Sequence, residues 1–251
     1  MVLQVDKERQ KVCVGFVGCD KLWHRKREGR KAIVINLIYL INVMNLNDQE
    51  DALIEELRFS GIEEDILEAM KKVKREFFVL KEDLNNAYEN NALPLGYNST
   101  ISQPYTVAIM LQELELKRNL NVLEIGTGSG WNVSLIGYLI GKKGMVYTTE
   151  VNEKIIKLAK KNIKNVGIKN IKFFYGDVLK KDLFKGLKFD RIIVTAAAYE
   201  TPKKLIKMLK NNGVLLCPVG KEVQKLVKIK KKNNKLIKKY LGDFIFVRLK
   251  E

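Results

Sequence analysis

Residues 122–141 read VLEIGTGSGWNVSLIGYLIG, a short apolar run, a glycine-rich turn and a longer apolar run. Gly126, Gly128 and Gly130 follow the first run, which predicts a strand, and precede the second, which predicts a helix from about residue 131 to residue 140. Glycine permits a tight turn and lets a ligand approach the amino end of the helix, because no side chain intervenes. This junction therefore predicts a site for a nucleotide-like ligand.

Acidic residues around this loop narrow the class of ligand. Glu124 lies two residues before the first glycine, and Glu150 ends the next apolar run, 20 residues beyond Gly130. A carboxylate at position 150 accepts hydrogen bonds from both ribose hydroxyls, whereas one at position 124 repels a pyrophosphate. S-adenosylmethionine, which has a cationic amino-acid end and no phosphates, fits this pattern, and Asp177 is placed to recognise its adenine amino group. The predicted cofactor residues are Glu124, Gly126, Thr127, Gly128, Gly130, Glu150 and Asp177.

Strand and helix patterns alternate from Asn121 onward. Strands are expected at NVLEI, MVYTTE, IKFFYGD, FDRIIVTAA and VLLCPVG, and the last two are separated by a helix over TPKKLIKMLKNNG, residues 201–213. This alternation predicts an α/β fold with a doubly wound, mostly parallel, Rossmann-like sheet. The closing segment, QKLVKIKKKNNKLIKKYLGDFIFVRL, predicts an antiparallel hairpin at one edge of that sheet.

The chain divides into three predicted segments. Residues 1–43 combine the basic cluster KLWHRKREGRK with short apolar runs. We expect either that this extension is poorly ordered or that it is not translated, in which case Met44 is the biological start. Residues 44–118 begin with amphipathic helices and are expected to cover the substrate and cofactor sites. Residues 119–251 form the predicted S-adenosylmethionine-binding α/β domain and its hairpin.

The composition indicates which compartment and which metal sites to expect. No apolar run reaches the roughly 18–20 residues of a membrane-spanning helix, and the longest candidate, residues 32–43, contains two asparagines. No secretion signal is recognisable, so a cytoplasmic protein without a membrane segment is expected. Cys13, Cys19, Cys217 and the single His24 do not have the spacing of a metal site, so none is expected.

The net charge of +17 raises the question of a nucleic-acid partner. Lysine far outnumbers arginine and is spread over many segments, whereas arginine supplies the planar fork that reads bases and phosphates. We therefore do not expect a specific nucleic-acid partner, and we expect a monomer.

Six stretches, in order along the chain, resemble protein-L-isoaspartate O-methyltransferases, a family of class I S-adenosylmethionine-dependent enzymes. They are REFFV, LPLGYNSTISQPYTVAIMLQELEL, VLEIGTGSG, FDRIIVTAAA, LLCPVG and FVRL, and the resemblance spans residues 69–249. It implies methylation of the carboxyl group of L-isoaspartyl residues in damaged proteins, which is a repair activity. It also implies that Ser102 and Thr100 hold and orient that carboxylate, and that the substrate site is lined by Ile101, Thr195, Ala196 and Ala197.

The chemistry implied by the resemblance needs few catalytic groups. A carboxylate is ionised at neutral pH and attacks the sulfonium methyl group itself, so no general base is required. Gln103 and Tyr105 stand where the family has a small residue and a histidine. This difference keeps a methyltransferase for another carboxylate, a dedicated peptide or RNA as an alternative, and a non-catalytic cofactor-binding protein as a third hypothesis. Ser102 also suits a cap for a helix beginning at Pro104.

Overall fold

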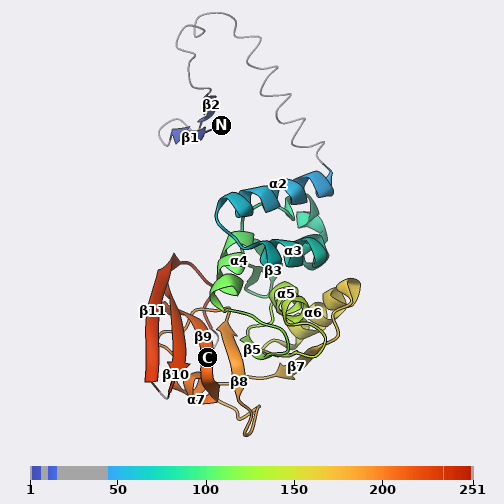
Figure 1. Ribbon diagram of the computed structural model, residues 1–251. Coiled ribbons are helices and arrows are strands. Elements are labelled where there is room, and N and C mark those ends of the chain that lie inside the picture. The colour runs from blue at the N-terminus through green and yellow to red at the C-terminus, as the bar shows by residue number, and fades with distance from the viewer. Residues whose placement is uncertain (1, 7–10, 16–44, 234, 250–251) are drawn as a thin grey trace, which may run out of the picture. The chain divides into compact units, whose positions relative to one another are not determined.

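The computed structural model describes residues 2–6, 11–15, 45–233 and 235–249 (Figure 1). The chain divides into two compact units, Met1–Asn45 and Leu46–Glu251. In the first unit, β1 (Val2–Asp6) pairs antiparallel with β2 (Lys11–Gly15). The apolar run at residues 32–43 and the proposed start at Met44 lie outside the described residues, so the expectations for them stay predictions.

Within the described part of the second unit, a seven-stranded sheet has the order β11-β10-β9-β8-β5-β6-β7. The five strands from β9 to β7 in this order are parallel, and β10 and β11 add to the edge as an antiparallel hairpin. The predicted α/β fold and its C-terminal hairpin are thus confirmed. The strands are β5 (Asn121–Ile125), β6 (Met145–Glu150), β7 (Ile171–Tyr175), β8 (Phe189–Val194), β9 (Leu209–Gly220), β10 (Gln224–Lys232) and β11 (Lys235–Phe244).

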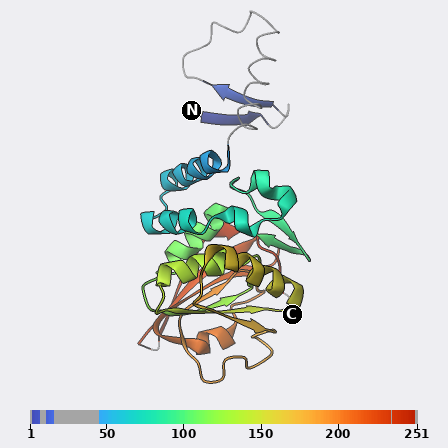
Figure 2. The ribbon, with the colours of Figure 1, turned by 90° about the vertical axis from the view of Figure 1, so that its right-hand side faces the viewer.

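Helices lie on both sides of the sheet (Figure 2). The layer on one side contains α2 (Leu46–Phe59), α3 (Glu64–Lys72), α4 (Pro104–Glu113), α5 (Trp131–Ile140) and α6 (Glu153–Val166). The other side carries the short helix α7 (Lys203–Met208). Between α3 and α4, two 3-10 helices, η1 (Arg75–Phe78) and η2 (Lys81–Asn86), lead into a small hairpin of β3 (Leu93–Gly96) and β4 (Ser99–Ile101).

Alternation along the strands divides the interior into two cores. On β5, Val122 packs into the core under the large helical layer, and the next residue, Leu123, packs into the core on the side of α7. Ile193 and Ile192 on β8 divide in the same way. Successive strand side chains point to opposite faces, so a sheet covered on both sides reads as a continuous apolar run.

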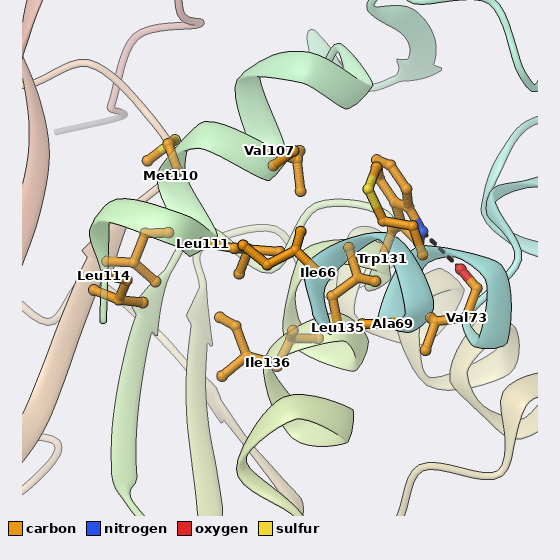
Figure 3. Packing of buried hydrophobic residues seen from close by; sticks show 14 of the residues in the cluster. Ile66, Ala69, Val73, Val107, Met110, Leu111, Leu114, Trp131, Leu135 and Ile136 are labelled. Carbon is orange, nitrogen blue, oxygen red and sulfur yellow. Dashed lines mark hydrogen bonds between the residues drawn. The ribbon is translucent and has the colours of Figure 1, made fainter. Parts of the chain in front are cut away.

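Trp131 links the start of α5 to the N-terminal helices. Its ring is 2% exposed and packs among side chains of α3, α4 and α5, as Figure 3 shows. Its indole N–H donates a 2.9 Å hydrogen bond to the carbonyl oxygen of Val73, just beyond α3. This bond satisfies the polar atom of a buried indole and fixes the first turn of α5 against the N-terminal helices.

The predicted helix over residues 201–213 is too long. α7 ends at Met208, and β9 begins at Leu209 rather than at residue 214. The pairing of β9 with β8 shifts register, since Phe189 pairs with Leu209 and Arg191 with Val214. This bulge keeps Leu209 in the core, and Lys210 forms a 2.9 Å ion pair with Asp190. Long-range pairing therefore overrides the local helical pattern.

Candidate active site

A cavity of about 680 Å³ opens at the carboxyl ends of the parallel strands. β5 lies between β6 and β8, and the chain leaves β5 for α5 but leaves β8 for α7 on the opposite face. Such a switch point creates a crevice in which doubly wound proteins bind ligands. The lining comes mainly from residues 98–103, 105–107, 125–129, 131–132, 149–151, 176–178, 195–196 and 243–249.

The glycine loop supplies both space and close packing. The backbone of Gly128 has φ 53°, and a Cβ built there meets only the carbonyl oxygen of Thr100, at 3.9 Å, so the loop presents an open face. A Cβ at Gly126 would collide with the hydroxyl of Thr195. Gly130 lies outside the cavity lining, and a Cβ built there would lie only 3.0 Å from the side chain of Ile163 in α6. Gly126 and Gly128 thus face the cavity, and Gly130 permits the packing of α5 on α6.

Glu150 at the end of β6 is held in place by backbone donors. Its Oε1 accepts hydrogen bonds from the N–H groups of Val151 at 2.9 Å and Asn152 at 3.1 Å, and its Oε2 accepts from Gly128 at 3.4 Å. Asp177, which follows β7, accepts a 2.7 Å bond from the N–H of Leu179. Both carboxylates line the cavity. The position of Glu150 suits recognition of a ribose diol, and that of Asp177 suits recognition of an exocyclic amine.

Glu124 lies beneath the glycine loop instead of facing the cavity. It is fully buried, and its oxygens accept hydrogen bonds from Thr148 Oγ1 at 2.6 Å and Asn132 Nδ2 at 2.8 Å. Thr148 in turn shares a 2.7 Å hydrogen bond with the hydroxyl of Thr127. Burial raises the pKa of Glu124 to about 8. The carboxyl group therefore supports the loop from below, and it does not carry a full negative charge at neutral pH.

The β3–β4 hairpin brings Thr100, Ile101 and Ser102 into the cavity. In the part of the chain that the structure describes, the Ser102 hydroxyl has no hydrogen-bond partner, and the residue that precedes α4 is Gln103. Ser102 therefore does not cap α4. Its carbonyl oxygen accepts a 3.2 Å hydrogen bond from the buried guanidinium of Arg75.

Of the two residues that differ from the family pattern, Gln103 makes contacts through its side chain and Tyr105 through its backbone. The Gln103 amide donates to the carbonyl oxygen of Asn90 at 2.9 Å and accepts from the hydroxyl of Thr106 at 3.0 Å. The backbone N–H of Tyr105 donates to the Asn90 side chain at 3.0 Å. Gln103 thus fastens the start of α4 to the segment before β3.

The wall that follows β8 is partly occupied by the C-terminal segment. Thr195 and Ala196 line the cavity, and the Thr195 hydroxyl donates to the carbonyl oxygens of Gly126 at 2.7 Å and Ile125 at 3.0 Å. Ala197 does not line it. The Ala197 N–H donates to Val247 O at 2.8 Å, and its carbonyl oxygen accepts from Leu249 N at 3.0 Å. The backbone of Ala197 is therefore already paired.

Ten of the predicted site residues share this one cavity, and Glu124, Gly130 and Ala197 support it from outside. Asn132 and Met110 also line it but were missing from the prediction. The sequence held a signal for Asn132, a lone amide in the first turn of an apolar helix, directly after the glycine loop.

A parallel sheet whose switch point holds an open glycine loop, with carboxylates after two neighbouring strands, defines a class I S-adenosylmethionine-dependent methyltransferase. The described cavity lining contains Glu150, Asp177 and Asp243 but only one cationic side chain, which does not suit a phosphate-bearing cofactor. The chain belongs to the protein-L-isoaspartate(D-aspartate) O-methyltransferase (PCMT) family, whose model matches residues 48–251.

Proteins of this family are similar to the chain along most of its length. The protein-L-isoaspartate O-methyltransferase of Fervidobacterium nodosum is 43% identical over 196 residues, covering 78% of this chain and 98% of that protein. The enzyme of Dictyoglomus turgidum is 45% identical over 202 residues, covering 79% and 90%. A crystal structure described as the Plasmodium falciparum PCMT, in complex with S-adenosyl-L-homocysteine, has a TM-score of 0.73 and 28% identity, covering 79% of this chain and 97% of that one.

The chain is accordingly an enzyme that uses S-adenosylmethionine to methylate L-isoaspartyl residues of proteins. Among the described residues, no helix is both long and apolar enough to cross a membrane.

Proposed function

We propose that methyl transfer takes place in the cavity that Ser102 and the glycine loop line together. The observation that carries this proposal is the state of Ser102, whose side chain lines the cavity without a partner among the described residues while Arg75 holds its backbone. An uncommitted hydroxyl donor on a fixed backbone is suited to binding a carboxylate in one orientation. Thr100 is the second hydroxyl of this group, and Ile101 supplies an apolar floor.

The cofactor residues divide into those that contact the ligand and those that support the loop. In this proposal Glu150 accepts the ribose hydroxyls, Asp177 the adenine amino group, and the backbone at Gly126, Thr127 and Gly128 lies against the amino-acid end. Glu124 and Gly130 act from behind, through the network to Thr148 and the packing on α6. When bound, S-adenosylmethionine supplies a methyl group on a sulfonium.

The residues of the chain orient and enclose the reacting carboxylate. Ser102 Oγ–H donates to one carboxylate oxygen and leaves the other free to attack. No proton has to be removed from the nucleophile, so the reaction needs no general base beside Ser102. Apolar side chains at Ile101, Val107 and Phe246 line the same space and limit access of water to the reacting charges.

The finer properties of the enzyme are also proposals. We propose that it acts as a cytoplasmic monomer on damaged proteins that contain isoaspartate. Multi-angle light scattering after gel filtration tests the monomer, for which a mass near 28.9 kDa is expected for the full chain.

The reaction is tested with tritiated S-adenosylmethionine and three acceptors, an isoaspartyl peptide, its aspartyl twin and bulk tRNA. We expect base-labile label on the isoaspartyl peptide alone, and label on tRNA would overturn the proposal.

Two variants test the assigned roles. Ser102→Ala should lower kcat about 10- to 100-fold with little change in cofactor Kd, because it removes an orienting donor. Ser60→Ala, whose hydroxyl bonds only to the α2 backbone, is the matched control. A Ser102→Ala enzyme with unchanged kcat would remove Ser102 from the mechanism.

Glu150→Ala should weaken cofactor binding about 10-fold or more.

A further inference from the structure

The cavity has an uneven distribution of charge. Its described lining carries three acidic side chains, Glu150, Asp177 and Asp243, and a single cationic one, Arg248. Glu150 and Asp177 lie at the cofactor end, and Asp243 forms a 3.1 Å ion pair with Lys225 of β10. Arg248 is therefore the one cationic residue that the described cavity lining offers to a bound substrate.

Arg248 is held in a defined position. The backbone of Arg248 forms a parallel β-bridge with Ala197. The neighbouring residues Val247 and Leu249 are both hydrogen-bonded to the backbone of Ala197. The Nη1 of Arg248 donates a 2.5 Å hydrogen bond to the carbonyl oxygen of Gly220. The guanidinium carbon lies 4.6 Å from the centroid of the Tyr199 ring, which stacks on it. The side chain is thus oriented before any ligand arrives.

One edge of the guanidinium has no partner. Within residues 45–233 and 235–249, Nε and Nη2 of Arg248 make neither a hydrogen bond nor an ion pair. These two N–H groups form the side of the guanidinium that binds a carboxylate with two parallel hydrogen bonds. The Arg248 side chain is half-buried, so a carboxylate bound there is partly shielded from water and ions.

We propose that Arg248 determines specificity by binding the carboxylate of an aspartate or glutamate that lies a few residues from the isoaspartyl residue in the substrate. This inference rests on the proposed function, because it requires an isoaspartyl peptide to occupy the cavity. The reacting carboxylate is oriented at Ser102, and Arg248 lies on the separate C-terminal wall beside Ala197. The preferred substrates are accordingly acidic segments with a second carboxylate.

The test uses a series of isoaspartyl peptides in which each flanking position is, one at a time, Glu or Gln. The ratio of kcat/KM for the Glu peptide to that for its Gln twin is measured with the full-length enzyme. At one or two positions we expect a ratio of about 3–10, arising mainly in KM, and a smaller ratio at high salt. Arg248→Gln should bring this ratio close to 1, and Arg248→Lys should restore part of it.

Lys221→Gln is the matched control. Lys221 is an exposed cation next to Gly220 and lies outside the cavity lining, so its loss should leave the ratio unchanged. A ratio near 1 at every position in the native enzyme overturns the inference, and so does a ratio that survives in Arg248→Gln. An equal loss on both peptides means that Arg248 binds the reacting carboxylate or supports the fold, and it also overturns the inference. Failure to label any isoaspartyl peptide would instead contradict the proposed function.

Discussion

Arg75 is a buried cation that joins separate segments around the proposed substrate end of the cavity. Its side chain is 1% exposed, and its guanidinium lies 5.4 Å from the centroid of the Trp131 ring. Burial lowers the pKa of Arg75 to about 10, so the group is still charged at neutral pH. It donates to the carbonyl oxygens of Ala87 at 2.6 Å, Asn91 at 2.8 Å, Ser102 at 3.2 Å and Glu89 at 3.3 Å.

Replacing Arg75 by Lys should reduce both stability and turnover. A single ammonium cannot reach all of these carbonyl groups, and those it leaves are buried without a donor. We expect a loss of about 2–4 kcal/mol in the free energy of unfolding and a lower kcat, since the backbone of Ser102 is released. Urea denaturation and steady-state kinetics measure the two effects. Arg118→Lys, an exposed arginine with one 3.5 Å bond to Tyr138, should change neither.

Glu124 predicts a pH dependence of stability. Its pKa is raised from 4.5 to about 8, so between these values the folded protein keeps a proton that the unfolded chain has lost. The contribution of this group to the free energy of unfolding is complete below pH 4.5. It falls by at most about 1.4 kcal/mol per pH unit as pH rises through this window, and it is lost above about pH 8. Glu124→Gln, which needs no proton, should therefore gain stability relative to the native protein as pH rises. Urea denaturation at three pH values is the measurement, and exposed Glu153→Gln should show no such trend.

At the scale of elements, the β3–β4 hairpin places the proposed substrate residues. Its turn consists of Tyr97 and Asn98, both with φ 55°, which is the left-handed conformation required by a two-residue turn of this type. The hairpin carries Thr100 to Ser102 to the cavity, and the sequence analysis did not anticipate it. Its strands are too short for the alternation of polar and apolar residues to be seen.

Asn98→Val should strain this turn. A β-branched side chain at positive φ costs about 1–2 kcal/mol, and relief of that strain would displace the following Thr100 and Ser102. We expect a lower melting temperature and a higher KM for the isoaspartyl peptide, measured by calorimetry and kinetics. Asn98→Gly keeps the conformation and should behave like the native enzyme. Equal results for the valine and glycine variants would contradict this account of the turn.

At the scale of the whole molecule, the cavity is assembled from segments between residues 91 and 249. A ligand that contacts the glycine loop, Glu150 and Asp177 therefore stabilises distant parts of the chain together. S-adenosylhomocysteine at 100 times its Kd should raise the free energy of unfolding by about 2.7 kcal/mol. Differential scanning calorimetry measures the shift, which Glu150→Ala should reduce to about 1.4 kcal/mol or less at the same ligand concentration, because a 10-fold weaker Kd leaves the ligand at about 10 times its Kd. No shift in the native protein, at a concentration shown by calorimetric titration to saturate it, would contradict the placement of the cofactor site.

The sequence alone determined the features that depend on neighbours along the chain. The glycine loop between a strand and a helix, Glu150 after the next strand and Asp177 after the third are local patterns, and they predicted the α/β fold and the cofactor. The sequence motif TIS likewise indicated the proposed substrate residues, which line the same cavity as the cofactor residues.

Tertiary structure decided which of these groups are free to act. Glu124 faces Thr148 instead of the ligand, Ala197 is paired with the C-terminal segment, and Arg75 reaches Ser102 across 27 positions. Arg248 enters the same cavity from the end of the described chain and keeps one edge of its guanidinium unpaired among the described residues. Burial and hydrogen bonding between distant residues arise only when the chain has folded, and periodicity along the sequence does not encode them.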